Sequence, residues 1–328
     1  MNKEEIFKII QDYISDPPLM LIGTGLTIPA GIPGMKELGK YLQKNLDDKY
    51  SKDRNWEDVS NKLNNGEDLE TALTGYTLNE ALLNDIKSLT WELISNSDLR
   101  IFKEDFLFGV NPPFSKLLRK LLQPSRHHLD IITTNYDRYI EYCCDICNVA
   151  VSNGFSGTYL KKLKEINLNS KNNITLLKVH GSLDSFFDIK NRIGISLPLQ
   201  ETIPNGFVPE IITPGTNKFE EIMTSTSRQM VHYADSLIDR ARTFLCIGYG
   251  FNDTQIQERI IARIRSGIPI VIVTKDLTDR ALGIINNSSS NYAVILDGGK
   301  NKTRFIINKK ETIIDGLYWT IEGFDKII

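Results

Sequence analysis

The chain alternates between short runs of consecutive apolar residues and longer segments with helical periodicity. Runs of this kind, bounded by turn residues, are typical of buried parallel strands, and the longer segments are typical of helices that cover them. The clearest helix is expected over residues 227–241, where apolar residues recur at helical spacing. The expected strands lie within residues 19–25, 129–133, 174–179, 243–247 and 269–273. Ligands bind such sheets beyond the carboxyl ends of the strands.

A long stretch with helical periodicity separates the first two expected strands. From Gly34 to about Gln123 there are few β-branched runs, and apolar residues such as Leu69, Ala72 and Leu73 follow helical spacing. Strands that alternate with helices elsewhere predict the α/β class. We therefore predict a Rossmann-like, mostly parallel sheet covered by helices, formed by residues 1–35 and 126–328. Residues 36–125 are predicted to form a helical insertion subdomain.

The charge balance changes the range of expected partners. The 328 residues include 39 Lys and Arg against 41 Asp and Glu, a net charge of −2. Without a broad positive field, direct binding of nucleic acid or of an anionic membrane is not expected. No apolar run approaches the roughly 20 residues of a membrane helix, and residues 1–14 read as an amphipathic helix, unlike a secretory signal. A cytoplasmic location is therefore expected.

Cysteine usage agrees with an intracellular protein. Only four cysteines occur, and Cys143, Cys144 and Cys147 fall on one expected helix, with Cys246 in an expected strand. This spacing does not indicate a disulfide framework. We expect the cysteines of the helix to pack in the core.

Two polar segments follow the first two expected strands. The first, residues 23–34, begins Gly-Thr-Gly and could bring its backbone close to a phosphate or could merely turn the chain. It lacks the third glycine of the usual dinucleotide-binding spacing. The second, Thr133-Thr-Asn-Tyr-Asp137, gathers small polar side chains. Asn135 and Asp137 could form a site, or only a turn and a helix cap.

Two further segments follow later strands. His180 precedes a glycine directly after an expected strand, whereas His127, His128 and His232 are interpreted as structural. Residues 245–253 run from a strand into Gly248-Tyr-Gly250, which could form a second phosphate or ribose cradle. Asn252 or Asp253 would then cap a helix expected near residues 254–265.

In this order, the four segments resemble the NAD-binding core of the sirtuin family. The family's Gly-Ala-Gly-x-Ser loop and later Gly-Ile-Pro are similar to residues 23–27 and 31–33. Its Thr-Gln-Asn-x-Asp and His-Gly motifs are similar to residues 133–137 and 180–181, and its Gly-Thr-Ser turn loosely to Gly248 and Gly250. The resemblance spans residues 18–40 and 128–275 and leaves out the helical stretch.

The departures from the family pattern bear on activity. Gly-Ile-Pro-Asp-Phe-Arg of the protein deacylases is here Gly31-Ile-Pro-Gly-Met-Lys36, without the acid, the aromatic residue or the arginine. Only Cys144 and Cys147 form a Cys-x-x-Cys pair, so no zinc ribbon and no metal are expected. The chain instead resembles bacterial sirtuin-like NAD hydrolases of antiphage defence. Residues 317–324 resemble the ending of stand-alone members that work beside a HerA-like ring ATPase.

The resemblance implies an NAD glycohydrolase that takes NAD as its substrate and releases nicotinamide and ADP-ribose. It implies that Asn135 orients the water or the ribose hydroxyls, that His180 accepts a proton, and that Asp137 engages the nicotinamide amide. The remaining expected NAD-binding residues are Gly23, Thr24, Gly25, Thr27, Ile32, Pro33, Thr134, Gly248, Tyr249, Gly250 and Thr274.

Two alternatives remain open at this point. One is a non-catalytic module that binds NAD or ADP-ribose and regulates a partner, and the other is an atypical NAD-dependent protein deacylase. An enzyme that drains NAD needs restraint, so we expect a homo-oligomer with a second protein as trigger. The helical insertion and the C-terminal helix are the expected contact surfaces.

Overall fold

A nine-stranded sheet forms the centre of the computed structural model, which describes residues 1–122, 128–166, 168, 173–215, 225–251, 254–287 and 291–328. The seven strands from β12 to β3 run parallel, and β13 and β14 add antiparallel to one edge. This confirms the predicted α/β class with a mostly parallel sheet. In spatial order the strands are β14 (Lys310–Asp315), β13 (Lys302–Ile307), β12 (Tyr292–Asp297), β11 (Ile270–Val273), β10 (Phe244–Ile247), β1 (Leu19–Ile22), β2 (His128–Thr133), β6 (Asn173–Lys178) and β3 (Ala150–Ser152).

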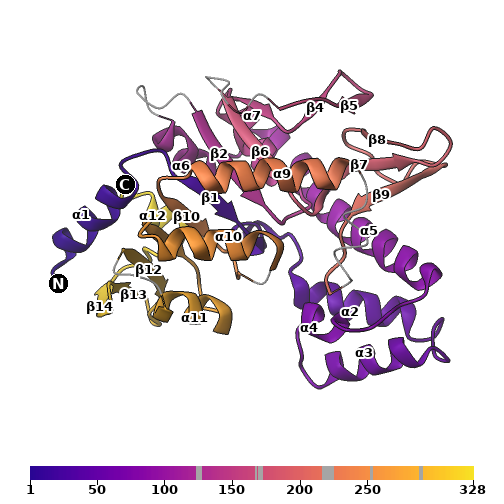
Figure 1. Cartoon of the computed structure of the whole chain (residues 1–328), viewed down its shortest axis with the longest axis horizontal. Coiled ribbons are helices and arrows are strands. Elements are labelled where there is room, and N and C mark those ends of the chain that lie inside the picture. The colour runs from indigo at the N-terminus through magenta and orange to yellow at the C-terminus, as the bar shows by residue number, and fades with distance from the viewer. Residues whose placement is uncertain (123–127, 167, 169–172, 216–224, 252–253, 288–290) are drawn as a thin grey trace.

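Helices cover both faces of this sheet (Figure 1). One face carries α1 (Lys3–Tyr13), α6 (Pro113–Leu121), α7 (Tyr139–Ile146) and α12 (Ile321–Phe324). The other carries α9 (Ser225–Arg240), α10 (Thr254–Arg265) and α11 (Asp279–Asn287). Side chains alternate along each strand, so both faces of the apolar strands are buried.

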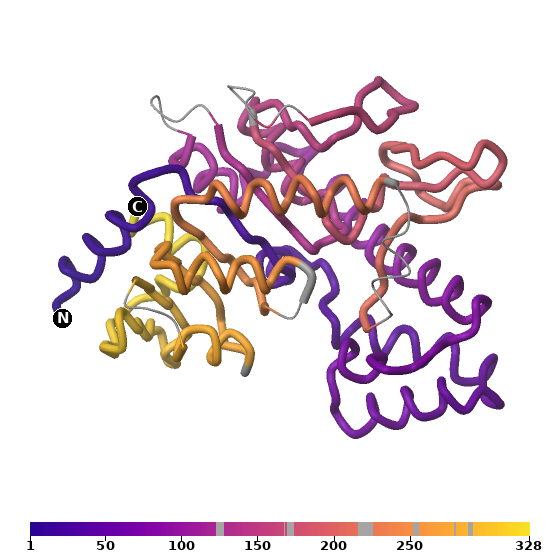
Figure 2. Tube along the Cα trace, viewed as in Figure 1, coloured from indigo at the N-terminus to yellow at the C-terminus, as the bar shows by residue number. Residues whose placement is uncertain are grey.

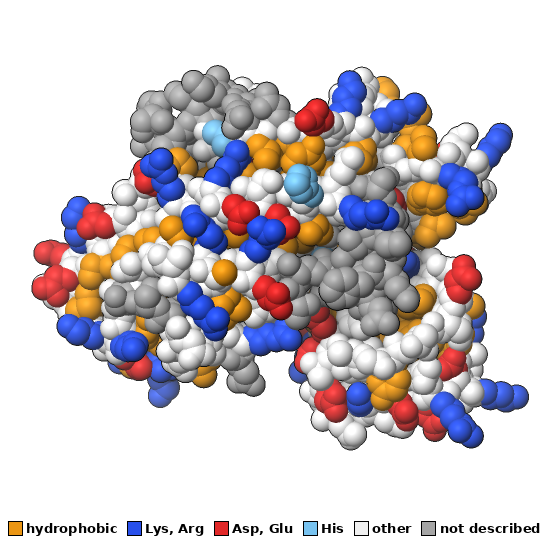
Figure 3. All heavy atoms as spheres, in the orientation of Figure 1, with side chains coloured by type: hydrophobic (Ala, Val, Ile, Leu, Met, Phe, Trp, Pro, Cys, Tyr) orange, Lys and Arg blue, Asp and Glu red, His pale blue; other side chains and the backbone are white. Residues whose placement is uncertain are grey.

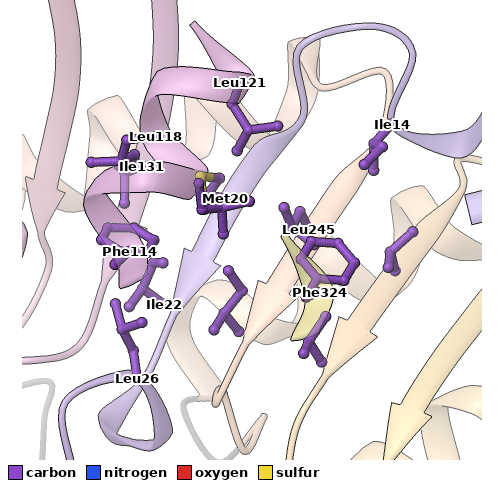
Figure 4. Close-up of a cluster of buried hydrophobic side chains, with 14 of the residues drawn as sticks. Ile14, Met20, Ile22, Leu26, Phe114, Leu118, Leu121, Ile131, Leu245 and Phe324 are labelled. Carbon is purple, nitrogen blue, oxygen red and sulfur yellow. The ribbon is translucent and has the colours of Figure 1, made fainter. Parts of the chain in front are cut away.

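The core beneath α6 shows how the central strands are held (Figure 4). Met20 and Ile22 of β1 pack with Leu245 of β10, while Phe114 of α6 and Phe324 of α12 close the cluster. Phe324 is fully buried. Burying side chains of this size stabilises the fold by roughly 1.5 to 3 kcal/mol each. The short C-terminal helix therefore packs inward on the sheet.

The segment after β1 is helical and has a core of its own. It contains α2 (Met35–Leu46), α3 (Arg54–Asn64), α4 (Leu69–Leu73) and the long α5 (Glu80–Glu104), and the trace of these helices forms a lobe beside the sheet (Figure 2). Trp56, Leu42 and Leu82 lie in this core. The short turn η3 (Phe106–Phe108) follows α5. Helix α6, within the predicted 36–125 range, instead packs on the main sheet.

A second, antiparallel sheet was not predicted from the sequence. Its strands lie in the order β4 (Phe155–Ser156), β5 (Lys161–Leu163), β8 (Ile193–Ser196), β7 (Gly181–Asp188) and β9 (Phe207–Ile211). Trp91 of α5 packs on it: the indole Nε1 donates to the carbonyl of Leu183 at 2.9 Å, and its ring lies 5.9 Å from that of Phe186. The insertion and the second sheet therefore meet directly.

The strand order places a crevice beside β1. This strand pairs in parallel with β2 on one side and with β10 on the other. The chain thus first builds the sheet in one direction and later returns to extend it in the other. Such a switch point leaves a crevice at the carboxyl ends of the strands, where ligands of open α/β sheets bind.

The apolar length of the helices and the surface charge bear on two sequence predictions, those about membranes and about nucleic acid. None of the described helices is long and apolar enough to cross a membrane. On the face in Figure 3, basic and acidic side chains are interspersed. That distribution fits the net charge of −2 and gives no broad basic surface on this face.

Candidate functional site

A cleft of about 330 Å³ lies at the carboxyl ends of β1, β2, β10 and β11. This volume falls at the lower end of the range of small-molecule sites, about 300 to 1,000 Å³. Of the fourteen residues predicted for the site, all but Thr27 line it. They are Gly23, Thr24, Gly25, Ile32, Pro33, Thr134, Asn135, Asp137, His180, Gly248, Tyr249, Gly250 and Thr274. Their individual roles stay predictions.

The glycines of the first and fourth segments pack against each other. A Cβ built on Gly23 would lie 2.4 Å from the carbonyl oxygen of Gly248, and one on Gly25 would lie 2.6 Å from its Cα. Gly248 has a φ of +55°. Any side chain here would separate the two loops. The glycines therefore allow close contact between the loops, a reason that the sequence interpretation did not include.

The backbone after Gly23 forms short 3-10 turns instead of entering an α-helix. These turns are η1 (Thr24–Leu26) and η2 (Ile28–Ala30), and α2 begins only at Met35. Gly34, the N-cap of α2, therefore comes eleven residues after Gly23. Of the residues in these turns, Thr24, Gly25 and Ile28 line the cleft.

The side-chain amide nitrogen of Asn135 is held by hydrogen bonds, whereas no residue that the structure describes holds its amide oxygen. Its Nδ2 donates to the carbonyl of Gly23 at 3.2 Å and to Oγ1 of Thr27 at 3.3 Å. Its backbone N–H donates to Oγ1 of Thr133 at 3.1 Å. The buried Oδ1 has no hydrogen-bond partner among the described residues. Thr27, fully buried, thus supports the Asn135 amide from behind and does not line the cleft.

His180 lies between β6 and β7, where the chain passes from the main sheet into the second one. Its carbonyl accepts from the N–H of Ile212 at 2.9 Å, and the residue is nine-tenths buried. Gly181 follows with a φ of +86°, and a Cβ there would lie 1.8 Å from the carbonyl oxygen of Glu210. Strand β9 therefore fixes the backbone of the His-Gly pair.

We expect Gly181→Ala to destabilise the protein by about 2 kcal/mol more than Gly66→Ala, because both replacements force alanine to a positive φ but only one creates a clash. Gly66 has a φ of +88°, and nothing lies within 4 Å of its added Cβ. Urea unfolding of the two variants measures the difference in the free energy of unfolding. Equal losses would show that β9 moves away without cost.

Asp137 lines the cleft and also accepts a hydrogen bond from the start of α7. Its Oδ1 accepts from the N–H of Tyr139, in the first turn of α7, at 3.2 Å. The interpretation of this segment as a turn into a helix is therefore confirmed, and a ligand-binding role for the same carboxyl stays a prediction. Burial raises the pKa of Asp137 to about 7, the Lys178 ammonium opposes this shift, and Asp98 adds to it. The carboxyl is thus poised to titrate near neutral pH.

The raised pKa predicts a pH-dependent difference between the wild type and Asp137→Asn. Between about pH 4 and pH 7 the unfolded chain has lost this proton while the folded chain keeps it, so the free energy of unfolding falls as pH rises through this window. Relative to the wild type, Asp137→Asn should gain about 4 kcal/mol from pH 4 to pH 8. Urea unfolding across this range tests it, and parallel curves for the two proteins would contradict it.

A buried ion-pair cluster supports the loop after β2. The backbone N–H of Arg138 donates to Asp98 Oδ1 at 2.7 Å, and its Nε donates to Asp98 Oδ2 at 2.8 Å. Its Nη1 reaches Asp184 of β7 at 2.8 Å. Tyr142 also donates to Asp98, at 2.6 Å. The insertion, the loop and the second sheet are joined here.

Several lining residues were missed by the sequence analysis. The insertion contributes Met35, Leu38, Glu70 and Ile94, and the loop after β11 contributes Asp276 and Thr278. Thr278 donates to the carbonyl of Gly250 at 2.6 Å and so joins the loops after β10 and β11. The second group could have been found, because it follows a predicted strand; the first has no such local signal.

The four cysteines, His128 and His232 lie outside the cleft lining. Cys143 and Cys144 are buried in the core and all four cysteines are unpaired, as expected. His128 contacts Asp130 at 2.7 Å, and His232 is exposed. His127 and the expected helix caps at Asn252 and Asp253 lie outside the described residues. The described residues contain no group of three or more potential metal ligands.

The fold and the cleft define a Rossmann-like α/β protein with a ligand-sized site at the switch point of its sheet. Residues 130–273 match the family model described as a SIR2-like domain, and this range contains Asn135, Asp137, His180 and Gly248. The predicted resemblance to sirtuins is thereby confirmed at the level of a SIR2-like domain over these residues. No curated protein sequence matches the chain.

Solved Sir2 structures are similar to the chain over most of its length. A structure of Sir2Tm bound to a propionylated peptide has 15% identity and a TM-score of 0.44, covering 83% of this chain and 88% of that chain. A complex described as Sir2, p53 peptide and NAD+ has 15% identity and a TM-score of 0.44, covering 85% and 89%. A structure on the mechanism and regulation of Sir2 enzymes has 13% identity and a TM-score of 0.48, covering 84% and 89%.

Proposed function

We propose that the protein is an NAD glycohydrolase that converts NAD and water into nicotinamide and ADP-ribose. The observation that carries the proposal is the free, buried Oδ1 of Asn135 in a cleft that also contains His180. The SIR2-like domain match over residues 130–273 supports NAD as the substrate.

The reaction breaks the bond between C1′ of the ribose and the nicotinamide nitrogen. The bonding electron pair leaves with nicotinamide, which becomes neutral, so the leaving group needs no proton. The water oxygen bonds to C1′, and one water proton is released. The protein must therefore stabilise a positively charged ribose, position one water and exclude others.

The cleft residues suit these tasks. Asn135 Oδ1 can accept a hydrogen bond from the attacking water or a ribose hydroxyl, since the opposite side of the amide is already held. His180 can accept the water proton, because a neutral imidazole has one ring nitrogen that acts as an acceptor. Asp137 is assigned to the nicotinamide amide, with Gly23, Thr24 and Gly25 on the pyrophosphate. Tyr249, Gly250 and Thr274 then remain for the adenosine side.

Nicotinamide release from NAD by the purified protein is the direct test. We expect turnover in the wild type and in His232→Ala, which changes an exposed histidine, and its loss in His180→Ala. Tight ADP-ribose binding without turnover under any activating condition would instead favour the regulatory binding module. Removal of acyl groups from lysine peptides would favour the deacylase.

We further propose that the enzyme acts as an NAD-depleting effector of bacterial antiphage defence, restrained by self-assembly and a HerA-like ring ATPase. The sequence resemblance suggests this role, and one surface feature supports assembly. In η3 and the residue after Gly109, the insertion exposes Leu107, Phe108 and Val110, with Phe108 81% exposed. Adjacent exposed apolar side chains of this kind often mark contact sites. Light scattering on the wild type and on Phe108→Ser tests the proposed self-assembly, which the variant should weaken. A wild-type monomer at micromolar concentration would contradict self-assembly.

A further inference from the structure

A buried lysine lies beside the proposed active site and has no role in the reaction as described so far. Lys178 is the last residue of β6, two residues before His180, and its side chain is 7% exposed. Its Nζ pairs with Glu141 Oε1 of α7 at 2.7 Å. Withdrawing an ammonium from water is costly, so a buried lysine usually has specific partners.

The partners of Lys178 belong to both loops that carry the proposed catalytic residues. Its Nζ donates to the carbonyl of Asp137 and lies 3.5 Å from the carbonyl of Tyr136. It also lies 3.4 Å from Oγ of Ser182, on the far side of the His-Gly pair. One ammonium therefore contacts the backbone directly after Asn135 and the side chain of Ser182, the second residue after His180.

These contacts constrain the peptide planes that aim the cleft side chains. The carbonyl of Tyr136 also accepts from the N–H of Leu183 at 3.0 Å, so the loop is fixed to β6 and β7 together. With the carbonyls of residues 136 and 137 turned toward Lys178, the side chains of Asn135 and Asp137 line the cleft. An apolar residue of similar length could fill the same space but could not hold two carbonyls.

We infer that Lys178 is a positioning residue of the proposed NAD hydrolysis: its ammonium ties the loop of Asn135 and Asp137 to the strand that carries His180. The inference rests on the proposed function. Displacing a reacting group by about 1 Å can cost about 100-fold in rate. The effect should therefore fall on kcat, while KM, set largely by the pyrophosphate and adenosine contacts, should change little.

Lys178 also sets the charge around Asp137. The carboxyl faces Lys178 from β6, Asp98 from α5 and Glu141 from α7, and of these three only Lys178 lowers its pKa. Without the ammonium, Asp137 should hold its proton to higher pH. The acidic limb of the pH profile of kcat should then move upward in pH, an effect that loss of packing alone would not produce.

The test compares Lys178→Met, which keeps the length of the stem, with Glu141→Gln, which removes the ion pair but leaves the carbonyl contacts. We expect kcat to fall by about 10- to 100-fold in Lys178→Met, and by less than about threefold in Glu141→Gln and in the surface control Lys302→Met. Lys178→Arg, which keeps the charge, should retain more activity than Lys178→Met. If Lys178→Met does not fold, Lys178→Met/Glu141→Gln leaves no isolated buried charge and should show the same loss of kcat.

Hydrogen exchange of residues 133–138 in the protein without substrate separates this inference from the proposed function. Faster exchange in Lys178→Met than in Glu141→Gln is expected whether or not the wild type turns over NAD. A wild type without turnover would overturn the proposed function, and with it any role of Lys178 in hydrolysis, while faster exchange would still support the anchoring. Unchanged exchange, or wild-type kcat in folded Lys178→Met, would overturn the inference.

Discussion

Asn135→Ala is expected to lower nicotinamide release by about 100- to 1,000-fold, the cost of removing one well-placed polar group from an active site. Its Oδ1 is buried and has no partner among the described residues, so it can accept a hydrogen bond from water at the reacting carbon. Alanine cannot accept that bond. Initial rates of nicotinamide release at saturating NAD measure the loss.

Two companion variants separate chemistry from folding. Thr27→Val removes the hydroxyl that accepts from Asn135 Nδ2 at 3.3 Å and should lower the rate by about tenfold, since the amide is still held by Gly23. Asn45→Ala, on the exposed side of α2, should leave the rate unchanged. Wild-type turnover by a folded Asn135→Ala would remove Asn135 from the mechanism.

The central strands could be predicted because their environment is uniform. β1, β10 and β11 are buried on both faces, and such strands are continuous apolar runs in the sequence. α10 spans Thr254–Arg265, the residues expected, because its periodic apolar face packs on the sheet. Local sequence and tertiary burial give the same signal here.

The second sheet gives a weaker signal in the sequence. Strands β4 and β5 have only two and three residues, and β7 mixes buried with half-buried positions. Its central turn places Arg192 at a φ of 55°, where a turn glycine would usually mark a hairpin. β7 also pairs with β9, so part of the sheet depends on contacts distant in sequence.

The site was predictable where topology alone decides it. Residues that follow neighbouring parallel strands meet at one edge of the sheet. Asn135, His180 and Gly250 follow three such strands, and all three line the same cleft. Ile94 could not be placed this way, because its position depends on how α5 packs against the second sheet. The steric need for glycine at Gly248 likewise exists only once two distant loops touch.

Asp98→Ala is expected to lower the free energy of unfolding by about 3 to 5 kcal/mol, the usual cost of removing one member of a buried ion pair. The Asp98 carboxylate is fully buried and accepts from Arg138 and Tyr142. Its loss leaves the Arg138 guanidinium buried with Asp184 as its remaining carboxylate partner among the described residues. Urea unfolding at neutral pH measures the effect.

Two control variants separate the loss of the buried ion pair from other effects on the free energy of unfolding. Glu104→Ala, on the same helix, breaks only the exposed pair with Arg100 and should cost less than about 1 kcal/mol. Asp98→Ala/Arg138→Met should recover part of the loss, because no unpaired guanidinium remains buried.

Since Asp98 lies on α5 and Arg138 follows Asp137, Asp98→Ala should also loosen the insertion from the cleft and raise KM for NAD. A loss below 1 kcal/mol would show that the insertion is held by its apolar contacts alone.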